Sequence, residues 1–205
     1  MNAIWKLEAL RWTRKPESCV VAPDRIEIIT QPHTDLWQRT YYCFRNDSAP
    51  VLQMESDEQY FSFAVRTEFA GKRRFDQCGI AVYLDSENWL KASVEYEDAL
   101  VQRLGAVVTN GGYSDWSSTD ISGSVTSMWF RLSRRESDFC IENSAGGTDW
   151  HQMRICHLSR AAKTVSFGIY ACSPEDSSFR AVFTGMELTR CKWSAHDGQP
   201  PAREQ

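Results

Sequence analysis

The segment Phe75–Trp116, FDQCGIAVYLDSENWLKASVEYEDALVQRLGAVVTNGGYSDW, alternates apolar residues with small or polar residues in three successive runs. Such period-two alternation is typical of antiparallel strands that bury one face. Short breaks rich in Asp, Asn, Ser and Gly, residues that favour turns, separate the runs. The segment therefore predicts three antiparallel strands joined by hairpins, with Cys78, Leu90 and Leu104 directed into a core.

The same pairing predicts what lies across the opposite face. Matching the apolar faces places Gly79, Ser93 and Gly105 side by side in one row. The flanking rows carry larger side chains, which are Gln77, Glu95 and Arg103 on one side and Ala81, Lys91 and Val107 on the other. A floor of small residues walled by an amide, a carboxylate and cations predicts a shallow ligand pocket on a solvated face.

Breaks of similar composition recur about every ten residues through the rest of the chain, a spacing that indicates many short strands. We expect about a dozen strands in two sheets packed face to face. The segment Trp5–Arg14 is expected to form an edge strand. Residues 1–194 are predicted to form a single domain, followed by a flexible polar tail at 195–205.

Composition narrows the class of protein. The chain has 205 residues and a formal net charge of −4, which argues against nucleic acid as a partner. It contains no apolar run long enough to span a membrane and no recognisable secretory signal. The seven cysteines include no CxxC pair, and the four histidines have no metal-ligand spacing. We therefore expect a cytoplasmic protein with no metal and no cofactor.

Three composite motifs carry a family resemblance: DQxG at Asp76–Gly79, YxDxxNWLKxxVE at Tyr83–Glu95, and TNGGYSDWS at Thr109–Ser117. With TDLWQRTYY at Thr34–Tyr42, they resemble the family that includes the yeast regulation-of-enolase protein, from about Trp12 to Leu188. The usual third motif has one glycine where this chain has two, a difference expected to alter only the turn. The resemblance implies an all-β, concanavalin A-like jelly-roll β-sandwich of two antiparallel sheets. Lectins and glucanases share that fold, so it does not fix the function.

We expect the face above Gly79 to bind a small polar ligand, a carbohydrate or sugar derivative. In this hypothesis Trp89 and Tyr83 form a stacking wall, and a loop carrying Asp115 and Trp116 closes one side. The predicted ligand-binding residues are Gln77, Tyr83, Trp89, Lys91, Glu95, Arg103, Asp115 and Trp116.

Two other classes stay open. A carbohydrate-active enzyme of the hydrolase or lyase type would use Glu95 with Asp115 or Lys91, and a glycosidase needs two carboxyl groups about 5–9.5 Å apart. Lys91 could serve as a base, or its stem could pack on an aromatic ring with its ammonium in water. Glu95 could instead form only a salt bridge with Arg103. A regulatory module would bind a protein partner, a metabolic enzyme such as enolase. The oligomeric state is left open.

Overall fold

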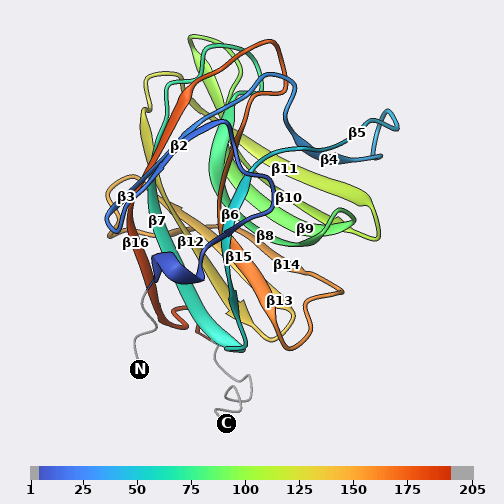
Figure 1. Cartoon of the computed structure of the whole chain (residues 1–205), viewed down its shortest axis with the longest axis vertical. Helices are drawn as coiled ribbons and strands as arrows, with labels where there is room; N and C mark the ends of the chain where they lie inside the picture. The colour runs from blue at the N-terminus through green and yellow to red at the C-terminus, as the bar shows by residue number, and fades with distance from the viewer. Residues whose placement is uncertain (1–4, 195–205) are drawn as a thin grey trace.

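The protein is a sandwich of two seven-stranded antiparallel sheets, and the computed structural model describes residues 5–194 (Figure 1). One sheet, which we call the site sheet, has the strand order β1-β6-β15-β8-β9-β10-β11. Its strands are β1 (Arg11–Trp12), β6 (Val51–Ser56), β15 (Val165–Cys172), β8 (Gln77–Asp85), β9 (Asn88–Tyr96), β10 (Val101–Asn110) and β11 (Tyr113–Ser122). The all-β sandwich expected from the sequence is confirmed.

The second sheet backs the first and has the order β14-β13-β12-β7-β16-β3-β2. Its strands are β14 (His151–His157), β13 (Asp138–Ser144), β12 (Ser127–Arg135), β7 (Tyr60–Glu68), β16 (Arg180–Arg190), β3 (Arg25–Ile29) and β2 (Ser18–Val21). A separate hairpin of β4 (Leu36–Gln38) and β5 (Arg45–Asp47) projects from one side of the sandwich (Figure 1). The expected polar tail, residues 195–205, lies outside the described residues.

The N-terminal segment differs from expectation. Instead of one edge strand, it forms a single 3₁₀ turn, η1 (Leu7–Ala9), followed by the two-residue β1. Trp5 and Leu10 both reach the core, and residues five apart on a strand would point to opposite faces. The turn brings both side chains to the same side. Among residues 5–194, no helix is long and apolar enough to cross a membrane.

The predicted central strands form with the predicted register. Gly79 pairs with Ser93, and Ser93 with Gly105; in the next row Gln77 pairs with Glu95, and Glu95 with Arg103. The chain continues into β11, which pairs along the whole of β10. On its other side β8 pairs with β15, a strand that arrives some ninety residues later in the chain, as in the pairing of Gly79 with Tyr170.

The main core lies between the sheets, but a second apolar cluster lies on the outer face of the site sheet. It comprises Leu36, Ala49, Val51, Ala81, Trp89, Val107, Tyr170 and Cys172. Leu36 comes from the β4–β5 hairpin and is fully buried, so the hairpin covers this part of the sheet. The face that the alternation suggested would be solvated is therefore largely buried. Period two separates the two faces of a strand, but it does not reveal what covers the outer one.

Candidate functional site

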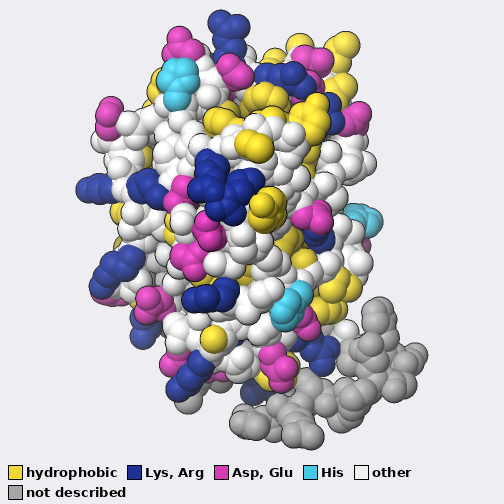
Figure 2. All heavy atoms as spheres, turned by 90° about the vertical axis from the view of Figure 1, so that its right-hand side faces the viewer, with side chains coloured by type: hydrophobic (Ala, Val, Ile, Leu, Met, Phe, Trp, Pro, Cys, Tyr) yellow, Lys and Arg dark blue, Asp and Glu magenta, His cyan; other side chains and the backbone are white. Residues whose placement is uncertain are grey.

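A pocket of about 850 Å³ opens on the outer face of the site sheet, beside the β4–β5 hairpin. It is lined by Asp35, Trp37, Thr40, Tyr41, Tyr42, Phe44, Arg74, Phe75, Gln77, Lys91, Glu95, Arg103, Val107, Ser114, Asp115, Trp116, Pro174 and Glu175. This volume is within the usual range of small-molecule sites. On this side of the molecule hydrophobic side chains gather in the upper part, and basic and acidic side chains lie together near the middle (Figure 2).

The hairpin is fastened to the sheet near its tip, where β4 ends. The Gln38 backbone N–H donates a hydrogen bond to Ser114 Oγ at 2.9 Å. Arg39 Nη2 contacts the Glu87 carboxylate at 3.0 Å, and its Nη1 donates to the Gly112 carbonyl in the β10–β11 turn. One wall of the pocket is therefore held in place by contacts to strands more than forty residues away.

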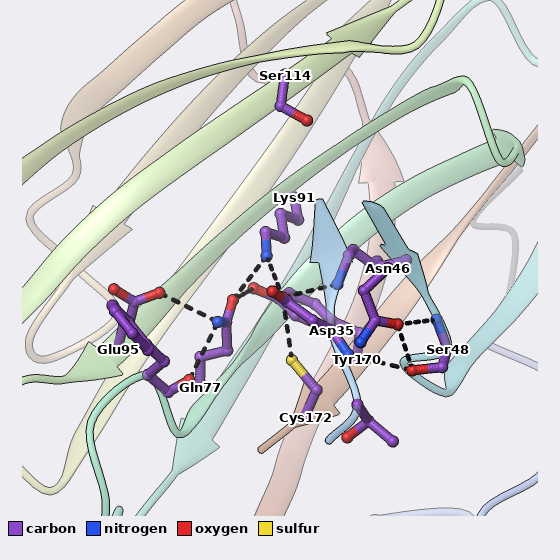
Figure 3. Close-up of polar contacts among 12 residues, drawn as sticks. Asp35, Asn46, Ser48, Gln77, Lys91, Glu95, Ser114, Tyr170 and Cys172 are labelled. Carbon is purple, nitrogen blue, oxygen red and sulfur yellow. Dashed lines mark hydrogen bonds and ion pairs between the residues drawn. The ribbon is translucent and has the colours of Figure 1, made fainter. Parts of the chain in front are cut away.

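The floor of the pocket is a buried polar cluster around Lys91 (Figure 3). Lys91 is only 4% exposed, and its Nζ donates to Gln77 Oε1 at 2.9 Å and lies 3.4 Å from Asp35 Oδ1. Tyr170 also donates its hydroxyl proton to Gln77 Oε1, at 2.9 Å. A buried ammonium is stable only when it is paired and hydrogen-bonded, and here an amide and a carboxylate meet that need.

Glu95 continues this cluster toward the pocket. Its Oε2 accepts a hydrogen bond from Gln77 Nε2 at 3.1 Å, whereas its Oε1 is sealed from solvent with no hydrogen-bond partner among residues 5–194. Burial raises the pKa of Glu95 to about 7, although the nearby Lys91 ammonium opposes the shift. A carboxyl with this pKa exchanges a proton near neutral pH, as general acids and bases do.

Aromatic side chains wall the pocket, but they are largely not the expected ones. Trp37, Tyr42 and Phe44 come from the hairpin, and Trp116 comes from β11. Trp37 and Tyr42 are stacked with their ring centroids 6.1 Å apart, and Tyr42 lies 5.8 Å from Phe44. Trp116 is 43% exposed, so its ring is accessible to a ligand.

Trp89 and Tyr83, expected to form the stacking wall, lie outside the pocket. Trp89 is fully buried beneath the hairpin, and its indole N–H donates to the Ser86 carbonyl. The Tyr83 hydroxyl donates to the Asp47 carboxylate at the end of β5, and burial raises the pKa of this tyrosine to about 12. Both rings support the hairpin, because it lies directly over them.

Asp115 also differs from expectation, since it lies within β11 and not in a loop. The alternation that directs Trp116 to the pocket directs the neighbouring Asp115 to the other face of the sheet. There its Oδ1 pairs with Arg154 Nη2 at 2.7 Å, on a strand of the second sheet. Asp115 borders the pocket, but its carboxylate and that of Glu95 are on opposite sides of the sheet. The proposed Glu95–Asp115 catalytic pair is therefore wrong.

The expected salt bridge between Glu95 and Arg103 is replaced by another pair. Arg103 Nε contacts Glu97 Oε2 at 3.0 Å, and Arg74 Nε contacts Glu97 Oε1 at 2.8 Å. Burial opposes ionisation of Glu97, but the hydrogen bonds from Arg103 and Arg74 outweigh it and lower the pKa of this carboxyl. Among residues 5–194, no cation is therefore in direct contact with Glu95.

Backbone conformations that L-residues seldom adopt gather around the pocket. Arg39, Tyr41 and Cys43, at the tip of the hairpin, have φ of 55°, 82° and 57°, and Phe75 on the opposite rim has φ of 71°. Such positions cost about 1–3 kcal/mol each and tend to cluster where a ligand is held. The groups of His, Cys, Asp and Glu in residues 5–194 include none with the arrangement of a metal site.

The predicted set of ligand-binding residues lacks those in and beside the hairpin, chiefly Asp35 and Trp37. Both lie in TDLW at Thr34–Trp37, part of the resemblance described above, and this was the available signal. Of the predicted ligand-binding residues, six line or border the pocket: Gln77, Lys91, Glu95, Arg103, Asp115 and Trp116.

Comparison with known proteins agrees with this description. A family model described as "Protein of unknown function (DUF1349)" matches residues 12–191. "Regulation of enolase protein 1" of Saccharomyces cerevisiae is 30% identical over 178 residues, which cover 87% of this chain and 88% of that protein. A crystal structure of a functionally unknown protein from Saccharomyces cerevisiae has a TM-score of 0.83 at 30% identity, covering 90% of this chain and 98% of that chain.

More distant structural similarity extends to glycoside hydrolases. The GH43 BlXynB protein from Bacillus licheniformis has a TM-score of 0.70 at 16% identity, covering 89% of this chain and 37% of that one. The xylan β-1,4-xylosidase from Bacillus halodurans C-125 has a TM-score of 0.70 at 13% identity, covering 92% of this chain and 38% of that one. At such identities the likeness concerns the fold alone.

Proposed function

The chain belongs to the family described as "Protein of unknown function (DUF1349)", and we propose that it binds a carbohydrate or sugar derivative in the pocket above Gln77, Lys91 and Glu95. The observation that carries the proposal is the polar floor beneath aromatic walls. Gln77 uses its amide group to hold Lys91 and Glu95 in fixed positions. Among residues 5–194, Lys91 Nζ bonds only Gln77 and Asp35, which leaves it one N–H to donate, and Glu95 Oε1 lacks a partner. A buried oxygen without a hydrogen bond is costly. Glu95 lines the pocket, and a rotation of its side chain would bring Oε1 within reach of a ligand hydroxyl.

The aromatic walls of the pocket suit the apolar face of a sugar ring. A pyranose has an apolar face of C–H groups and a rim of hydroxyls, so it binds where a flat ring lies beside polar groups. The partly exposed Trp116 supplies such a ring on β11, and Trp37 supplies another on the hairpin. A pocket with mostly apolar walls and a few placed polar groups is the usual form of a small-molecule site.

Titration calorimetry with D-glucose, D-galactose and D-xylose tests this proposal. We expect at least one of these sugars to bind, and Trp116→Ala to weaken that binding about twofold to tenfold, since a stacked ring contributes about 0.5–1.5 kcal/mol. Trp150→Ala is the matched control, because that indole packs over Arg131 outside the pocket. Equal binding by the wild type and Trp116→Ala would refute this site.

Catalysis on a sugar is a second candidate, favoured by the raised pKa of Glu95. Asp115 cannot assist, so the acid–base partner would be Lys91, which contacts Glu95 through Gln77. Such an enzyme would lose turnover in Glu95→Gln while keeping sugar affinity. Turnover that persists in Glu95→Gln would exclude this role.

A regulatory contact with a metabolic enzyme is a third candidate, suggested by the name of the yeast relative. Tyr41 at the hairpin tip is 94% exposed and Tyr42 is 56% exposed, which gives such a partner an aromatic surface. Co-elution with purified enolase, lost in Tyr41→Ser, would support the contact. Co-elution that is absent, or unchanged by Tyr41→Ser, would argue against it.

A further inference from the structure

One end of the pocket carries two arginines that share a single carboxylate. Arg74, in the loop before β8, and Arg103, on β10, both contact Glu97 at the end of the β9–β10 hairpin, at 2.8 and 3.0 Å. Arg103 has two further acidic neighbours, its cross-strand partner Glu95 on β9 and Asp120, which is 3.9 Å away and 69% exposed in its side chain. Glu97 is only partly buried, and Glu95 is partly protonated near neutral pH because its pKa is raised to about 7. The two guanidinium groups therefore exceed the negative charge that faces them at this end of the pocket.

Both contacts to Glu97 use the Nε atom, so they orient the guanidinium groups and leave the Nη groups available. Among residues 5–194, no hydrogen bond occupies either Nη group of Arg74, and the long contact to Asp120 engages only Nη1 of Arg103. Each guanidinium also lies over an aromatic ring that lines the pocket. Arg74 is 4.7 Å from the centroid of Phe75, and Arg103 is 5.9 Å from that of Trp116.

The positive charge is confined to this end of the pocket. At the floor, the Lys91 ammonium is matched by Asp35, and the Asp115 carboxylate is turned away toward Arg154. Glu175 adds an acidic group elsewhere on the rim. The pocket as a whole is therefore not basic, and an anionic group would bind at the arginine end while uncharged hydroxyls lie over the floor.

We propose that the ligand is an anionic sugar, one that carries a carboxylate or a monophosphate, and that its anion binds between Arg74 and Arg103. Guanidinium groups held in a fixed orientation bind planar carboxylates and phosphates through paired N–H donors, and such charge-assisted hydrogen bonds are stronger than neutral ones. The inference rests on the proposed sugar-binding function and adds the chemical class of the ligand and its orientation.

Calorimetry compares D-glucose, D-glucuronate and D-glucose 6-phosphate, with the corresponding galactose series, on the wild type, Arg74→Gln and Arg103→Gln. We expect an anionic sugar to bind at least tenfold more tightly than its neutral parent, and each substitution to reduce that preference about tenfold. Arg180→Gln is the matched control, because its side chain is 55% exposed against 56% for Arg74 and it pairs with Glu27 on the second sheet. A preference for glucuronate or for the phosphate identifies which anion the site takes.

The outcomes separate this inference from the proposed function. If neutral and anionic sugars bind equally, the anionic ligand is ruled out while sugar binding stands. If the preference survives both arginine substitutions, the anion does not bind between Arg74 and Arg103, and the inference is overturned while sugar binding again stands. If no sugar binds, both proposals fail. Arg74 lies in a loop and is more than half exposed, so Arg74→Gln is expected to fold even if Arg103→Gln does not.

Discussion

The substitution Glu95→Gln tests the electrostatics of the pocket directly. Burial raises the pKa of Glu95 from 4.5 to about 7, against the attraction of Lys91 and Arg103 and together with the repulsion of Asp35 and Glu97. Because the folded state binds this proton more tightly than the unfolded state, ionisation of Glu95 destabilises the fold. Its contribution to stability is greatest below about pH 4.5 and is lost as the pH rises through 7.

The size of this effect on the free energy of unfolding follows from the pKa shift of Glu95. A difference of about 2.5 units is worth roughly 3 kcal/mol at about 1.36 kcal/mol per unit, reached once the group is fully ionised in both states. At pH 5 the unfolded group is mostly ionised and the folded one is not, so roughly 1 kcal/mol of this loss is already present. Glu95→Gln removes the titration, and the variant should therefore gain about 2 kcal/mol relative to the wild type between pH 5 and pH 8.

Urea unfolding followed by tryptophan fluorescence, at pH 5 and pH 8, measures this difference. The pH dependence of the difference is the test, because any change in packing adds an offset that is the same at both values. Glu97→Gln is the control: the pKa of Glu97 is lowered, so the stability that its carboxylate adds is lost only in acid, below the unfolded pKa of 4.5. The stability difference for Glu97→Gln should therefore change little between pH 5 and pH 8. A stability difference for Glu95→Gln that stays constant from pH 5 to pH 8 would refute the reasoning.

Three further substitutions test the packing around the site. A Cβ in Gly79→Ala would overlap a carbonyl oxygen of β9, so we expect a loss of about 3 kcal/mol in urea unfolding. Gly146→Ala, whose Cβ would lie 3.8 Å from Thr148 Oγ1 at ordinary contact distance, should change little. Arg134 is fully buried and donates hydrogen bonds to backbone carbonyls of several loops. Arg134→Met should therefore cost about 3 kcal/mol of stability. A melting temperature within a few degrees of the wild type would contradict this prediction. Lys91→Met should cost about 3 kcal/mol of stability, because it leaves the Asp35 carboxylate unpaired. Adding Asp35→Asn to this variant should recover part of that loss. Stability changes of the two substitutions that simply add would argue against the pair.

Local alternation was enough to predict the register of the central strands. Within each strand between Phe75 and Trp116, the alternation shows which side chains face the core, and hairpins join strands that are neighbours in sequence. The row of Gly79, Ser93 and Gly105 and the row of Gln77, Glu95 and Arg103 both follow from this rule. The positions of the turn-forming residues and the hydrophobic alternation are together compatible with only one register of these strands.

What covers the outer face of these strands depends on contacts between segments that are distant in sequence, and no local pattern reveals such contacts. The hairpin that carries Trp37 and Tyr42 folds over β9 and β10 because Leu36 has an apolar surface to cover, and Trp89 was misplaced for the same reason. Trp89 alternates with the core residues, so it was assigned to the solvated face. The alternation was correct, but a second apolar layer lies over that face.

The composition of the outer face argues that its polar cluster serves a ligand. Burying a lysine and a carboxylate costs free energy, and well-packed apolar residues of similar size usually stabilise a fold at least as well. The same face of this chain contains such an apolar surface, formed by Trp89, Val107 and Tyr170 beneath the hairpin. Lys91 lies within that surface, but its ammonium lines the pocket beside Gln77. Glu95, whose Oε1 is unpartnered among residues 5–194, lies next to Gln77. Covering the sheet requires none of these polar groups, whereas recognising a ligand with many hydroxyls requires groups of this kind held in fixed positions.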